Sequence, residues 1–130
     1  MTENSYKTPC GFIHYFVNII DKQKITLVFL PGLTADHMLF EKQTEYFENK
    51  QNVFVWDAPS HALSRPFTNN YSLSDMAEWL DKISKKKKFI IRLLSVSLWE
   101  DIWLKCIWNY IRIRQKALSL LILHRSRSLI

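Results

Sequence analysis

Glycine and proline are scarce in this sequence of 130 residues, which contains 2 glycines and 4 prolines. The last of either type is Pro66, so residues 67–130 contain neither. Average usage predicts roughly one glycine or proline in every eight residues, and these residues form many of the tight turns of a domain. Their absence argues against an ordinary turn-rich α/β domain over the second half and indicates that two segments of different composition are joined.

Cysteine is also scarce, since Cys10 and Cys106 are the only two. They form no Cys-x-x-Cys or Cys/His spacing, which argues against a disulfide framework and a zinc site. We expect no metal and no cofactor. The longest late apolar run, ALSLLIL, is far too short to cross a bilayer. Residues 1–12 lack the basic and then apolar pattern of a secretory signal, so a cytoplasmic location is expected.

Charge is distributed unevenly along the chain. Residues 1–81 contain 6 Lys and Arg against 10 Asp and Glu, a balance of −4, whereas residues 82–130 contain 12 against 2, a balance of +10. The run of four lysines at 85–88 lacks the interleaved aromatic residues that stack on single-stranded nucleic acid. We therefore interpret this run as a solvated connection and expect no nucleic-acid partner.

The first two thirds of the chain show an alternation of strand and helix patterns. Residues 12–17 and 25–30 flank a turn signal at 21–22, and the second run is almost wholly apolar, as in a strand buried on both faces. Helical spacing follows at residues 39–47, a buried strand at 52–56, a helix at 72–83 with Ser72 and Asp75 as a capping box, and a strand from residue 87. This order predicts a parallel α/β sheet.

The expected inward-facing side chains of the two helices follow from the same spacing. The first helix places Leu39, Phe40, Gln43, Tyr46 and Phe47 on one stripe, and the second places Leu73, Met76, Ala77, Leu80 and Ile83 on one stripe. In parallel sheets the functional loops lie at the carboxyl ends of the strands. The loops at 31–37, at 57–66 and after Ile91 are therefore the candidate site.

The first loop carries a motif with a mechanistic meaning. The buried strand LVFL ends in Pro31-Gly32-Leu33, and this arrangement resembles the oxyanion-hole turn of the α/β-hydrolase fold family, in its branch of serine hydrolases and esterases. The resemblance implies that Gly32 forms a tight turn and that the Leu33 backbone N–H points at a developing oxyanion. Pro31 replaces the usual histidine, but the donor is a backbone group. An ordinary strand-to-helix turn is the alternative interpretation of this motif.

The second loop, DAPSHALSR, resembles the D-x-P-G-H-G-x-S segment of the same family. Asp57, Pro59, His61 and Ser64 match the pattern, while Ser60 and Ala62 replace the two glycines. In that family the segment is mainly structural and its histidine is not the catalytic one, so the resemblance implies a structural role for all four residues. It covers about residues 11–91.

The sequence after Ile91 departs from the family. The resemblance predicts a G-x-S-x-G nucleophile elbow there, followed by an acid and a histidine. Ser95 and Ser97 have no glycine beside them, no acidic residue follows Asp101, and His124 is the only later histidine. No catalytic triad can be assembled from these residues, so no catalytic residue is assigned.

A change of reading frame accounts for this departure. Suppose that the true reading frame is offset, so that each residue of the sequence supplies the last two bases of one codon and the first base of the next. The last base of the Trp99 codon, TGG, and the first two bases of the Glu100 codon, GA, then form GGA, a glycine codon. Trp108 and Asn109 produce a GAA glutamate in the same way. Permitted codons around them produce Gly-Gln-Ser-Met-Gly-Gly, which resembles the missing elbow. We therefore predict a partial α/β-hydrolase domain at 1–91 and an out-of-frame basic and apolar tail at 92–130, helical or disordered.

Two functions are consistent with these features. The first is a truncated α/β-hydrolase without activity, whose intact relatives hydrolyse small ester-like or related carbonyl substrates with a serine nucleophile and an oxyanion hole. The second is a non-enzymatic binding module, in which an amphipathic basic helix over residues 104–122 binds an anionic membrane surface or a protein groove. A membrane partner is the less expected of these outcomes.

Overall fold

Two fully buried strands form the centre of the molecule. The structure is a computed structural model that describes residues 1–18, 21, 23–32, 35–96, 105–106, 109–110 and 121–124. Strands β3 (Thr26–Leu30) and β4 (Asn52–Trp56) have every residue buried. They pair in parallel. Parallel strands are usually covered on both faces, and branched or aromatic side chains fill both faces here. The sequence prediction of two buried parallel strands is confirmed.

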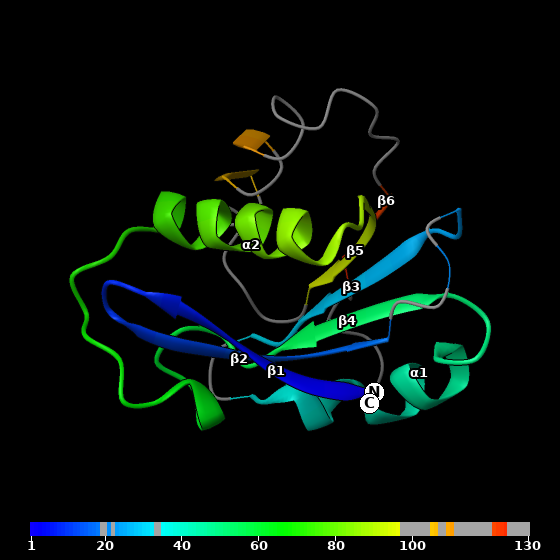
Figure 1. Cartoon of the computed structure of the whole chain (residues 1–130), viewed down its shortest axis with the longest axis horizontal. Helices are drawn as coiled ribbons and strands as arrows, with labels where there is room; N and C mark the ends of the chain where they lie inside the picture. The colour runs from blue at the N-terminus through cyan, green and yellow to red at the C-terminus, as the bar shows by residue number, and fades with distance from the viewer. Residues whose placement is uncertain are drawn as a thin grey trace.

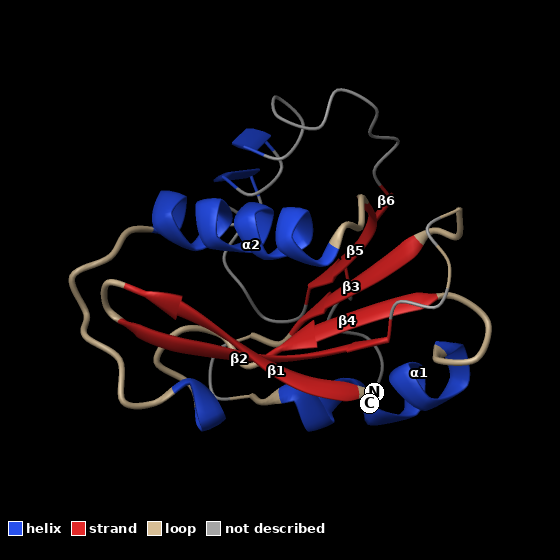
Figure 2. Cartoon of the chain, in the orientation of Figure 1, coloured by secondary structure: helices blue, strands red, loops and turns tan. Residues whose placement is uncertain are grey.

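The described strands belong to one six-stranded sheet in the order β1-β2-β4-β3-β5-β6 (Figure 2). Strands β5 (Ile91–Val96) and β6 (Leu121–His124) extend the parallel part of the sheet beyond β3. On the other side, β2 (Gly11–Asn18) runs antiparallel to β4, and β1 (Thr2–Thr8) runs antiparallel to β2. Strand β1 was not predicted from the sequence, because its residues are mostly polar and exposed.

The turn between β1 and β2 depends on Gly11. Its φ is 153°, and a Cβ at this position would lie 2.7 Å from the Phe67 ring and 2.8 Å from the Pro66 carbonyl oxygen. The Thr8 hydroxyl accepts hydrogen bonds from the backbone N–H groups of Cys10 and Gly11, both at 3.1 Å. Glycine is therefore required both by the backbone conformation and by the close approach of the segment at 66–67.

Helices cover both faces of the sheet (Figure 1). Helix α2 (Leu73–Lys87) lies on one face, and the short helices η1 (His37–Phe40) and α1 (Glu41–Phe47) lie on the other. The larger core is on the α2 side and includes Tyr15, Phe54, Trp56 and Leu80, while the smaller core on the α1 side includes Phe29 and Phe40.

Helix α2 agrees closely with its sequence pattern. The Ser72 hydroxyl accepts from the Asp75 backbone N–H at 3.1 Å and the Asp75 carboxylate accepts from the Ser72 N–H at 2.8 Å, which completes the capping box. Four of the five predicted inward residues, Met76, Ala77, Leu80 and Ile83, are buried, whereas Leu73 is exposed.

The first helix differs from its prediction. It is divided into a 3₁₀ turn, which starts at His37, and a seven-residue α-helix. Phe40 and Thr44 are its buried residues, while Leu39, Gln43 and Tyr46 are exposed. The predicted stripe was wrong for these three residues, because the 3₁₀ turn changes the angular spacing between residues 37–40 and the α-helix that follows.

The tail contains a strand that the sequence analysis did not predict. Strand β6 pairs in parallel with β5, so residues 121–124 are neither helical nor disordered as predicted. Residues 105–106 and 109–110 are helical, and Tyr110 packs against the larger core. No helix within the described ranges is both long and apolar enough to cross a membrane.

Candidate functional site

The candidate site lies at the carboxyl ends of β3 and β4, where the sequence analysis placed it. Pro31 and Gly32 follow β3 and are buried, and the Gly32 carbonyl oxygen accepts a hydrogen bond from the Ala35 N–H at 3.2 Å. The tight turn assigned to Gly32 stays a prediction, because residues 33–34 lie outside the described residues. Leu33, the predicted oxyanion-hole donor, lies outside the described residues, so its role stays a prediction.

Asp57 organises the second loop. Its carboxylate is fully buried, and one oxygen accepts from the His37 N–H at 2.8 Å and lies 2.9 Å from His37 Nδ1. The other oxygen accepts from the Leu63 N–H at 3.2 Å. A buried carboxylate needs such donors because burial otherwise penalises its charge. Asp57 thereby joins the start of η1 to the loop that follows β4.

Ser64 holds the other end of this loop against the sheet. The Ser64 hydroxyl donates to the Asp57 carbonyl oxygen at 2.6 Å and accepts from the His14 N–H of β2 at 2.9 Å. The Asp57 N–H in turn donates to the His14 carbonyl oxygen at 2.9 Å. These bonds attach both ends of the loop to strand β2 at His14.

Pro59 and His61 complete the set of four matched residues. The His61 Nδ1 atom is 2.9 Å from the Pro59 carbonyl oxygen, which also accepts from the Tyr71 hydroxyl at 3.2 Å. The Ser60 hydroxyl is 2.9 Å from the same Tyr71 hydroxyl. Tyr71 is a contact that the sequence analysis missed, because nothing local relates it to a loop 11 residues earlier.

Ser60 and Ala62, which replace the two glycines of the family segment, both have left-handed backbone conformations. Their φ angles are 71° and 44°. Residues with a Cβ adopt this region at a cost of roughly 1–2 kcal/mol. The loop therefore keeps the backbone shape that glycine favours although both glycines have been replaced.

The two loops enclose a polar pocket of about 430 Å³. Its lining residues are Ala35 and Asp36 from the first loop and Ser60, His61, Ala62 and Arg65 from the second. Its size is that of small-molecule sites. The carboxylate, imidazole and guanidinium groups could bind a small polar ligand there. The Ser60 hydroxyl that lines it contacts the Tyr71 hydroxyl.

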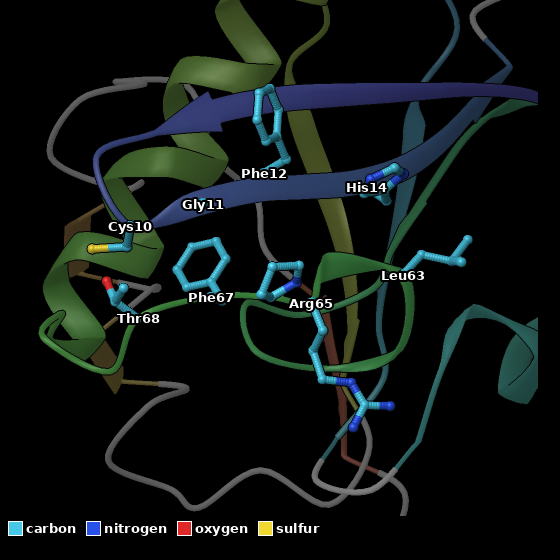
Figure 3. A pocket seen from close by; sticks show the side chains of 9 residues that line it. Cys10, Gly11, Phe12, His14, Leu63, Arg65, Phe67 and Thr68 are labelled. Carbon is cyan, nitrogen blue, oxygen red and sulfur yellow. The ribbon is translucent and has the colours of Figure 1, made fainter.

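A second pocket of about 460 Å³ lies between the β1–β2 hairpin and the segment at 63–68 (Figure 3). Cys10 and Thr68 lie at one end and Leu63 and His14 at the other, with Phe67 between them. The Arg65 side chain extends away from Phe67 in this view. Arg65 also lines the first pocket, so it lies between the two cavities.

The segment in which the resemblance predicts a nucleophile elbow makes none of the loop contacts described above. The backbone of β5 includes Ser95, but Ser97 and the residues after it up to 104 lie outside the described residues. Histidine, cysteine and acidic side chains form no group of three that could hold a metal ion in the described part of the chain. Among the described residues, the pocket thus brings together the first two predicted loops, and the segment that follows β5 is not among its lining residues.

Solved structures with the same arrangement of elements include three enzymes. An N-acyl homoserine lactone degrading enzyme is 18% identical, with a TM-score of 0.71 over 92% of this chain and 44% of its own. The Cif epoxide hydrolase from Acinetobacter nosocomialis is 17% identical, with a TM-score of 0.72 over 93% of this chain and 37% of its own. The chain has the α/β-hydrolase fold.

The α/β-hydrolase fold accommodates different chemistry in these enzymes. The third, 1H-3-hydroxy-4-oxoquinoline 2,4-dioxygenase, is 15% identical, with a TM-score of 0.68 over 90% of this chain and 44% of its own. The chain therefore spans less than half the length of each of the three enzymes. No family model and no curated protein matches the sequence. The fold is established by these similarities, and the reaction is not.

Proposed function

We propose that this chain is a truncated α/β-hydrolase that carries the oxyanion-side loops of an ester-cleaving site without a nucleophile, and that it does not hydrolyse esters. One observation carries the proposal. The loops after β3 and β4 line one small-molecule pocket, whereas β5 leads into a sequence without the glycines of a nucleophile elbow.

In intact relatives the reaction would proceed by acyl transfer. A serine hydroxyl attacks the carbonyl carbon, and its proton passes to a histidine. The resulting oxyanion accepts hydrogen bonds from backbone N–H groups, among them that of the residue that corresponds to Leu33 of this chain. Small ester-like molecules are the proposed substrates of such relatives. The lactone-degrading neighbour supports this class, because a lactone is a cyclic ester.

The loss of the elbow is best explained by the change of reading frame near residue 91. The nucleotide sequence from codon 88 onward tests this directly. We expect the offset frame to be open and to encode Gly-Gln-Ser-Met-Gly-Gly after the β5 codons. A stop codon within that stretch, or a frame without a Gly-x-Ser-x-Gly pattern, would refute the frame change while leaving the fold unaffected.

Activity is tested with the purified full chain against p-nitrophenyl acetate and N-hexanoyl homoserine lactone. We expect no turnover above a boiled sample. Turnover that disappears in Ser95→Ala or Ser97→Ala would overturn the proposal. As a positive control, the frame-restored protein should gain turnover and should lose it when its elbow serine is replaced by alanine.

The alternative function, a binding module with a basic amphipathic helix, gains no support from the described tail. Leu121 and Ile122, which that helix would include, lie in strand β6. Tyr110 packs against the core. Membrane binding itself stays a prediction, tested by flotation of the full chain with vesicles of phosphatidylserine and phosphatidylcholine. Binding that increases with the anionic fraction would support it.

A further inference from the structure

Strand β1 is the outer strand of the sheet on its antiparallel side. It pairs with β2 over all seven residues, from Thr2 opposite Val17 to Thr8 opposite Gly11. Thr2, Glu3, Ser5 and Lys7 are exposed. The second backbone edge of β1 has no neighbouring strand within the described sheet, so its outward N–H and C=O groups can pair with another strand.

Alternation along β1 separates its side chains into two sets. Asn4 and Tyr6 face α2, because Lys87 Nζ donates to the Asn4 side-chain oxygen at 2.8 Å and Lys86 lies over the Tyr6 ring at 5.9 Å. Glu3, Ser5 and Lys7 alternate with them and therefore lie on the opposite face. The α2 lysines are thus not on the same face as Glu3 and Lys7.

The sequence of β1 is complementary to itself in charge. In an antiparallel pair of two identical strands centred on Ser5, Ser5 lies opposite Ser5 and all seven residues are paired. Glu3 of each copy then lies opposite Lys7 of the other, on the same face of the sheet. We propose that a second copy of this chain pairs with β1 edge to edge in this register, which joins the two sheets through a twofold axis at Ser5.

Other registers are less favourable. Antiparallel pairing of identical strands that keeps each side chain on its own face must be centred on a residue. Centring on Asn4 or Tyr6 pairs only five residues and places Glu3 or Lys7 opposite Ser5. Oppositely charged cross-strand pairs stabilise a sheet, and the register about Ser5 forms two of them. The charges also discourage pairing with strands that lack a complementary pattern.

The proposed interface is small. A pairing of two seven-residue strands falls below the roughly 1,200 Å² of stable interfaces, so a weak and reversible dimer is expected. The Glu3 carboxylate is 3.4 Å from His14 Nδ1, and the Glu3 side chain is 57% exposed. It therefore remains accessible to a lysine from a second copy. The inference concerns assembly and does not depend on the proposed hydrolase ancestry.

Charge reversal tests the register. Sedimentation equilibrium of the full chain, at concentrations up to about 1 mM, should show a monomer–dimer equilibrium. Glu3→Lys and Lys7→Glu should each weaken dimerisation at least about tenfold, because like charges then face each other. The double variant should restore it. Glu45→Lys, an exposed reversal on α1, is the matched control and should leave the dissociation constant unchanged.

A monomeric wild-type chain over this range, or a double variant as weak as the single ones, would overturn the proposal. Disulfide trapping gives a second measurement, in a chain with Cys10 and Cys106 replaced by serine. Ser5→Cys should form a covalent dimer on mild oxidation, because directly opposed Cα atoms are about 4.5–5.5 Å apart. Thr2→Cys should not, because two copies of residue 2 lie about 20 Å apart in this register. Equal trapping of both, or of neither, would also contradict the proposal.

Discussion

Asp57 shows how a single side chain determines the shape of the candidate site. Its fully buried carboxylate is bound by the backbone N–H and the imidazole of His37 and by the backbone N–H of Leu63. His37 precedes Asp57 by 20 residues along the chain. Asp57→Ala leaves the two backbone donors and the imidazole without their acceptor. We expect a loss of about 2–3 kcal/mol in the free energy of unfolding, measured by urea titration. Asp21→Ala, in an exposed turn, should cost well under half as much.

Ala62 is held in a conformation that glycine adopts more easily, with a φ of 44°. Ala62→Gly relieves this strain but adds freedom to the unfolded chain. We expect a net gain of about 0.5–1 kcal/mol in unfolding free energy. Ala77→Gly in the buried interior of α2 has the opposite expectation, a loss of about 1 kcal/mol or more. If both changes destabilise the chain equally, the strain at residue 62 is refuted.

Tyr15 gives the stability a dependence on alkaline pH. Its side chain is fully buried, its hydroxyl has no hydrogen-bond partner among the described residues, and burial raises its pKa above the ordinary value of 10.0. Above pH 10 the unfolded chain loses this proton while the folded chain keeps it, so stability falls with rising pH. Below pH 10 both states are protonated and the effect disappears.

Tyr15→Phe should therefore flatten the decline in stability above pH 10 by up to about 1.4 kcal/mol per pH unit. It should leave stability at pH 7 unchanged or higher, because an unsatisfied buried hydroxyl is removed. Unfolding curves between pH 7 and pH 11 measure both effects. Tyr46→Phe, at an exposed position, controls for the other tyrosines, and an equal flattening in that variant would contradict the role of Tyr15.

At the scale of elements, a helix or strand was predicted correctly where its own residues carry a strong pattern. Helix α2 has a capping box and a long apolar stripe, and both are confirmed. Strands β3 and β4 are apolar except at their first residues, Thr26 and Asn52, and both are confirmed. Strand β1 has neither signal, because an edge strand with a solvent-exposed pattern looks like a loop in sequence. Its existence depends on pairing with β2, which is a non-local contact.

The capping box of α2 provides the test at this scale. Ser72→Ala removes the acceptor of the Asp75 N–H and should lower the unfolding free energy by about 1 kcal/mol, whereas Ser72→Gly should cost only a few tenths. Both values come from denaturant unfolding followed by circular dichroism. If the two variants were equally destabilised, the hydroxyl would not be the stabilising group.

At the scale of the whole molecule, β6 moves the open parallel edge of the described sheet from the six residues of β5 to the four residues of β6. Without β6, β5 would be the edge strand, and an exposed apolar edge strand is an aggregation liability. In the structure, β6 covers β5 by parallel pairing. A chain ending at residue 96 loses this strand, so we expect it to aggregate at concentrations at which the full chain remains in solution, as measured by light scattering. Equal scattering from the two chains would show that β6 does not protect the edge.

The sequence by itself determined the strand–helix alternation from β2 to α2, the capping box of α2, and the two loops of the candidate site, whereas the strand predicted from residue 87 begins only at Ile91. These features depend on short-range periodicity and on residue types with restricted backbone conformations. Only the tertiary structure decided that Asp57 binds His37, that β1 pairs with β2, and that residues 121–124 pair with β5. Each of these contacts joins segments that are distant along the chain. The free energy gained by burial and hydrogen bonding at such contacts is not visible in any local sequence pattern.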